Sequence, residues 1–396
     1  MQKNNTALAI ALGAVCALGP FATDMYVAAM PRMAVELGTT DANIQLSMMT
    51  YFIGFTLGQL FYGPVSDKTG RKPMIYLALA IFVLSSIGCT LSSSPLQLLA
   101  FRFLQGIGGS IGMVIATASI RDVYTGQAAA KLMSMVVLVL GIAPVLAPLL
   151  GSVLLQIGDW RMIFALLGAI GVVVSVIVVS IMPETRMAEL RATSRPADAL
   201  HWYGRLLFTR SFIPYAGALA LAQGGFFAYI AGSSFVLINV YGLSPMAYAV
   251  IFSLNAIGIG IGSQMAPRLA QQIGVRGVAK LGAIVCAAAG LLMLAMQLAG
   301  IAALVPVCML LFVMVMGIGS IHADLQHPRH GSAWSDFRHG SRADGSPRLR
   351  CRSTRQLRHR HPGRRHGAPD DRRHGRLRAR RSDSRHLHLR PVEGLP

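Results

Sequence analysis

The sequence predicts an all-α membrane protein, and three observations carry this prediction. Hydrophobic residues make up 54% of the 396 residues and charged residues only 13%, about half the share that is typical of soluble domains. The apolar residues gather in stretches of about 20, the length that a helix needs to cross a bilayer. Proline and glycine recur inside these stretches, which membrane helices tolerate better than soluble ones. An ordinary soluble domain is therefore excluded.

Ten apolar stretches of this kind precede residue 322, and we interpret each as a membrane span. The ten spans are 7–29, 44–63, 74–92, 96–117, 132–155, 162–182, 211–236, 246–266, 278–299 and 301–321. A polar gap at 183–210 divides them into six and four. Six helices before a polar linker are typical of transporters built from two six-helix halves. We therefore predict a complete N-terminal bundle over 1–182, a linker over 183–210 and an incomplete C-terminal half over 211–321.

The basic residues of the short loops predict the orientation in the membrane. With the N-terminus inside, the inner loops hold 14 Lys and Arg, and the outer loops hold only Arg32 and Arg161. Because basic residues are retained on the cytoplasmic side, this asymmetry places the N-terminus and the 183–210 linker in the cytoplasm.

Two ionisable residues, Asp24 and Arg102, fall inside predicted spans, where charges are costly and usually functional. From the rise per residue of a helix, they lie about 9 Å and about 6 Å from the midplane, on its outer side. We therefore expect them to face one another across a central cavity. Burial and a neighbouring cation act on a carboxylate in opposite directions, which would tune Asp24 to exchange a proton near neutral pH. A structural Asp24–Arg102 pair without a role in coupling is the alternative.

The sequence gives no sign of an enzyme, a cofactor or a metal site. It lacks the phosphate-binding pattern G-x-x-x-x-G-K-[ST], so we expect no ATP site and a proton gradient as the energy source. No nucleophile–base pair lies within the spans, and His201 stands alone in the linker. The cysteines have no metal-ligand spacing, and His359-Arg-His361 and His386-Leu-His388 lack further ligands, so we expect no metal.

The loop between the second and third spans reads Gly63-Pro-Val-Ser-Asp67-Lys68-Thr-Gly70-Arg71-Lys72. Its glycines suit a tight exit and a turn, its acid lies near a helix end, and its cations face the inner leaflet. This loop resembles the signature loop of the major facilitator superfamily. A degenerate copy, Pro267-Arg268-Leu-Ala-Gln-Gln-Ile-Gly274-Val-Arg276, follows the eighth span and supports repeated halves. A basic cytoplasmic loop with no further role is the alternative.

Further stretches narrow the resemblance to one group within the superfamily. Arg102 followed by Leu104-Gln105-Gly106-Ile-Gly108-Gly109 resembles the fourth-helix motif of the superfamily, and Gly141-Ile-Ala-Pro144-Val-Leu-Ala-Pro148-Leu-Leu-Gly151 resembles the fifth-helix motif of drug antiporters. A further set of motifs is similar to the Bcr/CflA group, which exports compounds such as bicyclomycin and chloramphenicol in exchange for protons. The set comprises Asp24-Met25-Tyr26 with Pro31, Arg121-Asp122-Val-Tyr124, Trp160-Arg161 and Pro183-Glu184-Thr185. The resemblance covers about residues 7–321. The departures from these motifs are Ala28, Ala143 and Ala147.

The resemblance implies a proton-coupled exporter of small drugs that works by alternating access in the bacterial inner membrane, as a monomer and with no nucleic-acid partner. It gives Asp24 the proton or substrate role and makes Arg102 its partner. The cytoplasmic gate would comprise Gly63, Asp67, Gly70, Arg71, Arg121 and Asp122. The antiporter motif, which would shape a bend against leak, comprises Gly141, Pro144, Pro148 and Gly151. Candidate contacts of the substrate are Tyr26, Gln105, Gln223 and Phe227. A metabolite or amino-acid exporter of the same fold is the alternative.

Residues 322–396 differ in composition from the rest of the chain. They hold 19 Arg against 7 acids, and ten of the eleven His, but no Ile, Met, Lys, Tyr or Asn. Because the missing residues have AT-rich codons and the enriched ones GC-rich codons, we infer a shifted reading frame that starts near 321–322. We expect this tail to be disordered and to replace the last two helices, which would impair transport. A real basic tail that binds RNA or anionic lipid is the alternative.

Overall fold

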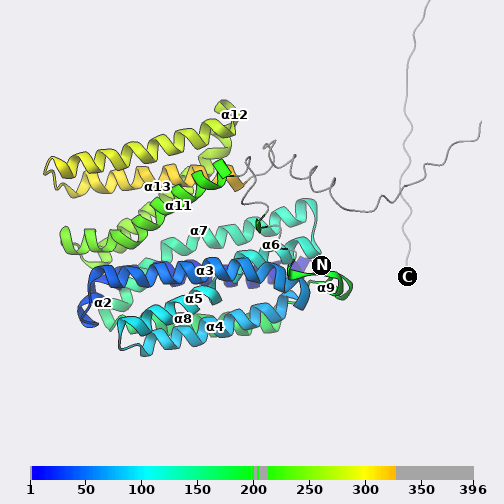
Figure 1. Ribbon diagram of the computed structural model, residues 1–396. Coiled ribbons are helices and arrows are strands. Elements are labelled where there is room, and N and C mark those ends of the chain that lie inside the picture. Colours follow the sequence, from blue (N-terminus) through cyan, green and yellow to red (C-terminus); the bar gives the residue numbers. More distant parts are fainter. Residues whose placement is uncertain (1, 198, 200–202, 205–212, 327–396) are drawn as a thin grey trace, which may run out of the picture. The chain divides into compact units, whose positions relative to one another are not determined.

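The computed structural model of the chain describes residues 2–197, 199, 203–204 and 213–326 (Figure 1). The helices of the N-terminal half are, in order, α1 (Gln2–Asp24), η1 (Val27–Ala29), α2 (Met30–Glu36), α3 (Asp41–Thr69), α4 (Arg71–Leu91), α5 (Pro95–Gly109), α6 (Ile111–Val123), α7 (Gly126–Ile157) and α8 (Arg161–Ile181). The linker holds α9 (Ala188–Thr193), and the C-terminal half holds α11 (Ile213–Ser234), the π-helix η2 (Phe235–Val240), α12 (Pro245–Leu298) and α13 (Leu304–Gln326). The predictions made for the tail beyond 326 lie outside the described residues.

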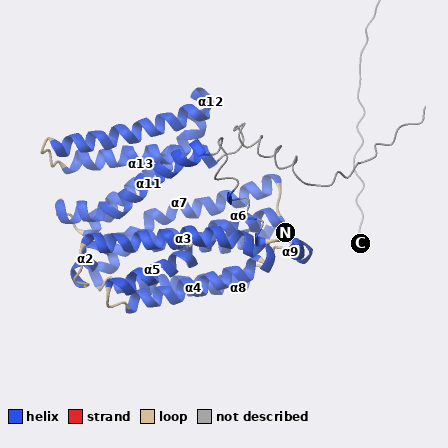
Figure 2. Ribbon diagram, viewed as in Figure 1, coloured by secondary structure: helices blue, strands red, loops and turns tan. Residues whose placement is uncertain are grey.

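All regular structure in the described residues is helical, and no strand occurs among them (Figure 2). Nine of their helical segments are long and apolar enough to cross a membrane. These nine match every predicted span except 44–63. The predicted fold class, an all-α membrane protein, is therefore confirmed.

The predicted span 44–63 lies within α3, a helix of 29 residues. Gln45, Thr50 and Gln59 lower the mean hydropathy of this helix, which explains why it is not among the nine apolar segments. α3 packs against α5, α6 and α4, and its Ser47 and Tyr51 are fully buried. Some of the polar side chains of α3 therefore face the interior of the protein.

The first predicted span, 7–29, lies within the apolar segment Ala7–Glu36, but this segment is not one continuous α-helix. α1 ends at Asp24, and the chain passes through η1 before α2 begins at Met30. Pro31 stands at the start of α2. Its ring would clash with the carbonyl of Val27 in a continuous helix, and it has no N–H to donate. The break therefore falls directly after Asp24, inside an apolar segment that is long enough to cross the membrane.

The signature loop and its degenerate copy share one backbone feature. Gly70 has φ 106° and ψ 157° between α3 and α4, and Gly274 has φ 74° and ψ 161° at a kink in α12. This region of backbone conformation is accessible almost only to glycine. The kink divides α12 into the two spans predicted at 246–266 and 278–299, so the two halves turn at matching places.

Helices of the same half of the chain pack against one another. Within the N-terminal half, α1 packs against α7, α6 and α8, and α4 packs against α5 and α8. Within the C-terminal half, α13 lies along α12 (Figure 1).

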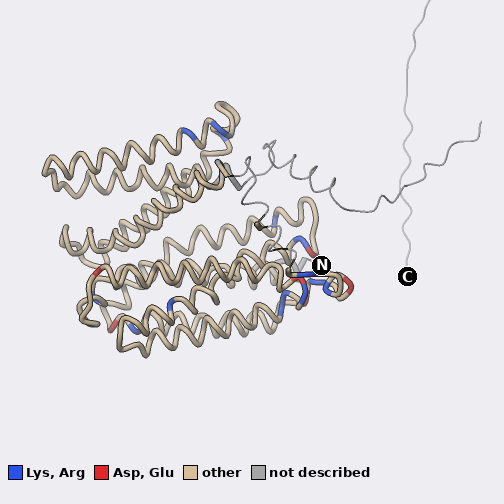
Figure 3. The backbone as a smooth tube through the Cα atoms, in the orientation of Figure 1, with Lys and Arg blue, Asp and Glu red and all other residues tan. Residues whose placement is uncertain are grey.

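Figure 3 shows that Lys, Arg, Asp and Glu gather at helix ends, most densely around α9. Asp24 and Arg102 stand apart from this distribution because each lies within an apolar span.

Candidate functional site

Asp24 is the last residue of α1, immediately before the break in the first span. The residue is only 5% exposed, and its Oδ1 accepts a hydrogen bond from Thr23 Oγ1 (2.8 Å). η1, which follows the break, packs against α7, α11 and α12. The carboxylate therefore lies close to the place where the first span meets helices of the C-terminal half.

Arg102, on α5, is fully buried and caps the C-terminal end of α1. Its Nη1 donates to the carbonyl oxygen of Ala22 (2.9 Å) and to Oε1 of Gln105 (2.6 Å). Ala22 is one of the last four residues of α1, whose carbonyls have no partner within the helix. A cation at this end also interacts favourably with the helix dipole. Gln105 in turn donates to Ser86 Oγ on α4 (2.8 Å). The guanidinium therefore links α1, α4 and α5.

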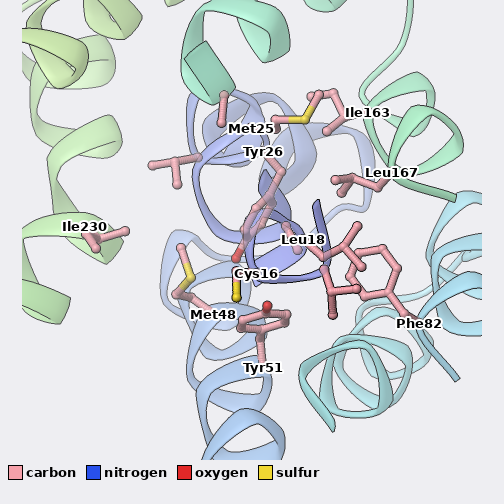
Figure 4. Packing of buried hydrophobic residues seen from close by; sticks show 14 of the residues in the cluster. Cys16, Leu18, Met25, Tyr26, Met48, Tyr51, Phe82, Ile163, Leu167 and Ile230 are labelled. Carbon is pink, nitrogen blue, oxygen red and sulfur yellow. The ribbon is translucent and has the colours of Figure 1, made fainter. Parts of the chain in front are cut away.

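Two tyrosine rings enclose the guanidinium of Arg102. Its Cζ lies 4.2 Å from the ring centre of Tyr26 and 4.3 Å from that of Tyr51. Both tyrosines belong to the buried core shown in Figure 4. Close packing of α3 on α5 brings Tyr51 this near, because any side chain at Gly106 would collide with the Tyr51 carbonyl. Cation–π contacts of this kind stabilise a desolvated guanidinium.

The structure does not pair Asp24 with Arg102. No ion pair joins the two in the part of the chain that the structure describes. Their relationship is indirect, because Arg102 binds the helix end that carries Asp24. Asp24 instead lies within electrostatic range of the hydroxyl groups of Tyr51, Tyr229 and Tyr248. Tyr229 and Tyr248 were not predicted near Asp24, since aromatic residues on apolar helices give no signal that separates a site from core packing.

The four predicted substrate contacts lie in two different settings. Tyr26 and Gln105 are fully buried in the N-terminal half and contact Arg102. Phe227 on α11 stacks on Phe52 of α3, with ring centres 3.9 Å apart. Oε1 of Gln223 is buried and has no hydrogen-bond partner among the described residues. Contact between any of these side chains and a substrate stays a prediction.

The antiporter motif lies on α7 and reaches the break in the first span through Gly151. Any side chain at Gly151 would collide with the carbonyl of Met25, which lies in that break. Pro148 is buried and Pro144 is half-buried, whereas Gly141 is exposed with open space around it. The end of the motif, rather than its start, therefore contacts the candidate site.

The predicted gate residues form a network around Arg71. Its guanidinium donates to Asp122 Oδ2 (2.9 Å) and to Asp67 Oδ1 (2.7 Å). A third bond goes to Ser66 Oγ (2.6 Å). Arg186, which follows α8, approaches the same two carboxylates, at 3.6 Å from Asp67 and 3.4 Å from Asp122. Arg71 thus brings together the predicted gate residues Asp67 and Asp122, and Arg186, which was not predicted as a gate residue, joins them.

Glu184, just after α8, caps the N-terminal end of α4. Its carboxylate accepts hydrogen bonds from the N–H groups of Arg71 (3.0 Å), Lys72 (3.1 Å) and Arg186 (2.9 Å). A Cβ at Gly70 would lie 2.5 Å from Glu184 Oε2, so glycine alone leaves room for this cap. Burial acts to raise the pKa of Glu184, but the backbone hydrogen bonds outweigh it and hold the pKa below its ordinary value of 4.5. Glu184 therefore ties the start of the linker to the signature loop.

Two predicted gate residues lie outside this network. Arg121 is exposed and takes part in none of the ion pairs found among the described residues. Gly63 lines a pocket of about 330 Å³ at the C-terminal end of α3. The other residues that line it are Pro64, Asp67, Ser194, Arg195, Ala199 and Tyr203. Within the described ranges, no cluster of three or more His, Cys, Asp and Glu side chains could hold a metal ion.

The chain with this broken first span and repeated glycine turn matches a known protein family. A family model described as Major Facilitator Superfamily matches residues 11–328. The chain belongs to this superfamily. The resemblance drawn from the sequence motifs is therefore confirmed.

Relatives within the superfamily include proteins named for drug resistance. The chain is 37% identical over 263 residues to an uncharacterized MFS-type transporter of Bacillus subtilis, YdgK, and the match covers 66% of this chain and 65% of the relative. It is 29% identical over 273 residues to a bicyclomycin resistance protein homolog of Haemophilus influenzae, covering 69% of each. It is 30% identical over 243 residues to the multidrug resistance protein MdtL of Escherichia coli, covering 61% of each. The matches thus span from 61% to 69% of the length of these relatives.

Solved structures of transporters share the fold. A bacterial homolog of the human lysosomal transporter Spinster, inward-facing and occupied, matches with a TM-score of 0.65 and 18% identity over 81% of this chain and 73% of the other. The xylose transporter XylE of E. coli, in a partially occluded inward-open conformation, matches with a TM-score of 0.64 and 12% identity over 82% of this chain and 83% of the other. At these identities the similarity shows the fold alone.

Proposed function

We propose that the chain exports small drugs across the bacterial inner membrane in exchange for protons, by alternating access. The observation that carries this proposal is Asp24, a buried carboxylate at the broken end of α1 within an apolar span. Relatives named for bicyclomycin and multidrug resistance support drugs as the substrate class. Chloramphenicol-like and bicyclomycin-like compounds are the substrates that we propose.

Asp24 is proposed to bind the proton and to release it when a substrate binds. A carboxylate at the negative end of a helix dipole is readily neutralised by a proton or by a polar group of a substrate. Arg102 is hydrogen-bonded to the Ala22 carbonyl at the same helix end, so its guanidinium does not compete directly with a proton for the Asp24 carboxylate. The proton gradient supplies the energy, at about 2.3 kcal/mol per charge per 100 mV of membrane potential, and no cofactor takes part.

The network around Arg71 is proposed as the cytoplasmic gate. Arg71 and Arg186 bring together the carboxylates of Asp67 on α3 and Asp122 on α6, and Glu184 fixes the start of α4. These contacts tie the ends of three helices to the linker. A stiff end of this kind would let the N-terminal half rock as one body, as alternating access requires.

The membrane setting and the partners are part of the same proposal. The N-terminus is proposed to lie in the cytoplasm, from the 14 basic loop residues against two. The chain is proposed to act as a monomer on a small-molecule drug and protons, with the lipid bilayer as its surroundings and without nucleic acid. A shifted frame after residue 321 would lower the transport rate but would leave Asp24 and Arg102 in place.

Binding of drugs to the purified chain tests the substrate class. Bicyclomycin, chloramphenicol and a panel of amino acids are added to the protein in detergent, and the unfolding temperature is recorded, since a ligand of the folded state raises it. The proposal expects a rise with at least one of the two drugs, smaller in Asp24→Asn. A rise with amino acids and none with either drug would instead indicate a metabolite exporter.

A further inference from the structure

Two donor nitrogens of the fully buried Arg102 have no acceptor among the described residues. Nη1 makes both of its hydrogen bonds, to Ala22 and Gln105, while Nε and Nη2 are buried and have no hydrogen-bond partner in the part of the chain that the structure describes. A buried charge with unsatisfied donors is costly unless another interaction stabilises it. The rings of Tyr26 and Tyr51, at 4.2 Å and 4.3 Å from Cζ, supply that interaction.

We infer that Tyr26 and Tyr51 are positioning residues, whose ring faces hold Arg102 on the end of α1 and away from Asp24, and thereby set the pH at which Asp24 exchanges its proton. This inference rests on the proposed role of Asp24 in proton exchange. It assigns the two tyrosines a function through Arg102 rather than through contact with the substrate.

Both rings are held in place by contacts other than the one to the guanidinium. The hydroxyl of Tyr26 is hydrogen-bonded to Ser47 Oγ on α3 (3.3 Å), and the hydroxyl of Tyr51 donates to the carbonyl of Gly19 on α1 (3.3 Å). Phe164 on α8 lies behind Tyr26, with ring centres 5.8 Å apart. The rings therefore have partners on α1, α3 and α8, and their position does not depend on the charge of Arg102 alone.

Loss of one ring would free Arg102 to approach Asp24. Nη1 binds the carbonyl of Ala22, two residues before Asp24 along α1. An ion pair with the carboxylate would give Nε or Nη2 the acceptor that each now lacks. A carboxylate in contact with a guanidinium gives up its proton at a lower pH. The expected consequence of losing a ring is therefore a shift in the titration of Asp24 toward acid.

The other titratable groups near this pair are tyrosines and a cysteine. Those that interact electrostatically with Asp24 or Arg102 from neighbouring helices are Tyr51 on α3, Cys89 on α4, Tyr229 on α11 and Tyr248 on α12. The charged residues of α6, α7 and α8 lie in the first or last two turns of these helices and are Arg121, Asp122, Lys131 and Arg161. Arg102 is therefore the cation whose position Asp24 would sense.

Infrared difference spectroscopy of the purified full chain tests the inference without requiring transport. The carbonyl band of protonated Asp24 is followed against pH and is identified by its loss in Asp24→Asn. Tyr51→Leu removes the ring, whereas Tyr51→Phe keeps the ring and removes the hydroxyl. We expect the midpoint of the Asp24 band to fall by about one pH unit or more in Tyr51→Leu and to stay near that of the parent in Tyr51→Phe. Tyr26→Leu and Tyr26→Phe form a second, independent pair.

Each outcome distinguishes this inference from the proposed function. A midpoint that is unchanged in both Leu variants would overturn the positioning role and leave the role of Asp24 intact. Equal shifts in the Phe and Leu variants would assign the effect to the hydroxyl groups and also overturn it. If the parent protein shows no Asp24 band at any pH at which it stays folded, that result would count against the proposed function itself. If one Leu variant does not fold, the Leu and Phe variants of the other tyrosine provide the test.

Discussion

Arg102 binds the carbonyl oxygen of Ala22 (2.9 Å). This bond joins the interior of one apolar span to the C-terminal end of α1 in another, and it places a buried cation where the hydrogen bonds within α1 come to an end. The same helix end carries Asp24. The arginine is therefore as much a cap for a broken helix as a neighbour of a carboxylate, and its substitution has consequences for both.

Substitution of Arg102 by lysine is expected to destabilise the protein although the charge is kept. An ammonium group cannot donate to Ala22 and Gln105 and also present a flat face to two tyrosine rings. We expect a loss of about 2 kcal/mol or more in unfolding free energy. The measurement is thermal unfolding in detergent.

Arg32→Lys is the matched control for that substitution. Arg32 also caps a helix, by donating to the carbonyls of Leu155 (3.5 Å) and Gly158 (3.1 Å) near the end of α7, but its side chain is 47% exposed. Water can replace these contacts, so the expected change is below about 1 kcal/mol. Equal destabilisation by the two lysines would contradict the account of Arg102.

Two glycines of the antiporter motif are expected to respond differently to alanine. Gly151→Ala would push α7 away from the Met25 carbonyl and disturb the break after Asp24. Gly141→Ala adds a methyl group to open space and favours the helix. We expect Gly151→Ala to lower thermal stability and drug binding and Gly141→Ala to lower neither. Similar behaviour of the two variants would show that close contact with the break is not what Gly151 provides.

The two repeated turns offer a second matched pair. Gly70 and Gly274 share an unusual backbone conformation, so alanine is strained at both, by about 1–3 kcal/mol. At Gly70 the added methyl group also meets Glu184 Oε2 at 2.5 Å, whereas at Gly274 nothing lies within 4 Å. We expect Gly70→Ala to be the more destabilising variant in thermal unfolding. The difference should largely disappear in a Glu184→Ala background, and its persistence there would argue against the clash.

Glu184→Gln is expected to lower stability in a pH-dependent way. The pKa of Glu184 is lower in the folded protein than its ordinary value of 4.5. Its charged form therefore stabilises the fold above that ordinary value, and this contribution is lost as the pH falls through the lower, folded value. The unfolding temperatures of parent and variant should differ by a constant amount between about pH 6 and pH 8 and converge at acid pH. A difference that grows toward acid pH would have the wrong sign.

The helices and the two intramembrane charges could be predicted from the sequence because both depend on local composition. Length and hydropathy place the spans, and a single Asp or Arg within an apolar stretch is visible by inspection. The break after Asp24 was also encoded locally, in Pro31, but a proline near the end of an apolar stretch is compatible with a kinked helix as well as with a broken one.

The contacts of the site could not be predicted, because they depend on how distant helices pack. Whether Arg102 meets Asp24 or the carbonyl of Ala22 is decided by the approach of α5 to α1 and of α3 to α5. Glu184 was quoted only as part of a family resemblance. Its partners are backbone N–H groups, which every residue except proline carries, so no sequence pattern marks them.

If Asp24 gives up its proton when a drug binds, drug binding must release protons into solution. Bicyclomycin or chloramphenicol is added to the purified chain in unbuffered detergent solution at several pH values, and a pH indicator records the protons released by the parent and by Asp24→Asn. We expect release by the parent near neutral pH and none by the variant. Drug binding to the parent with no release of protons, or equal release by parent and variant, would contradict it.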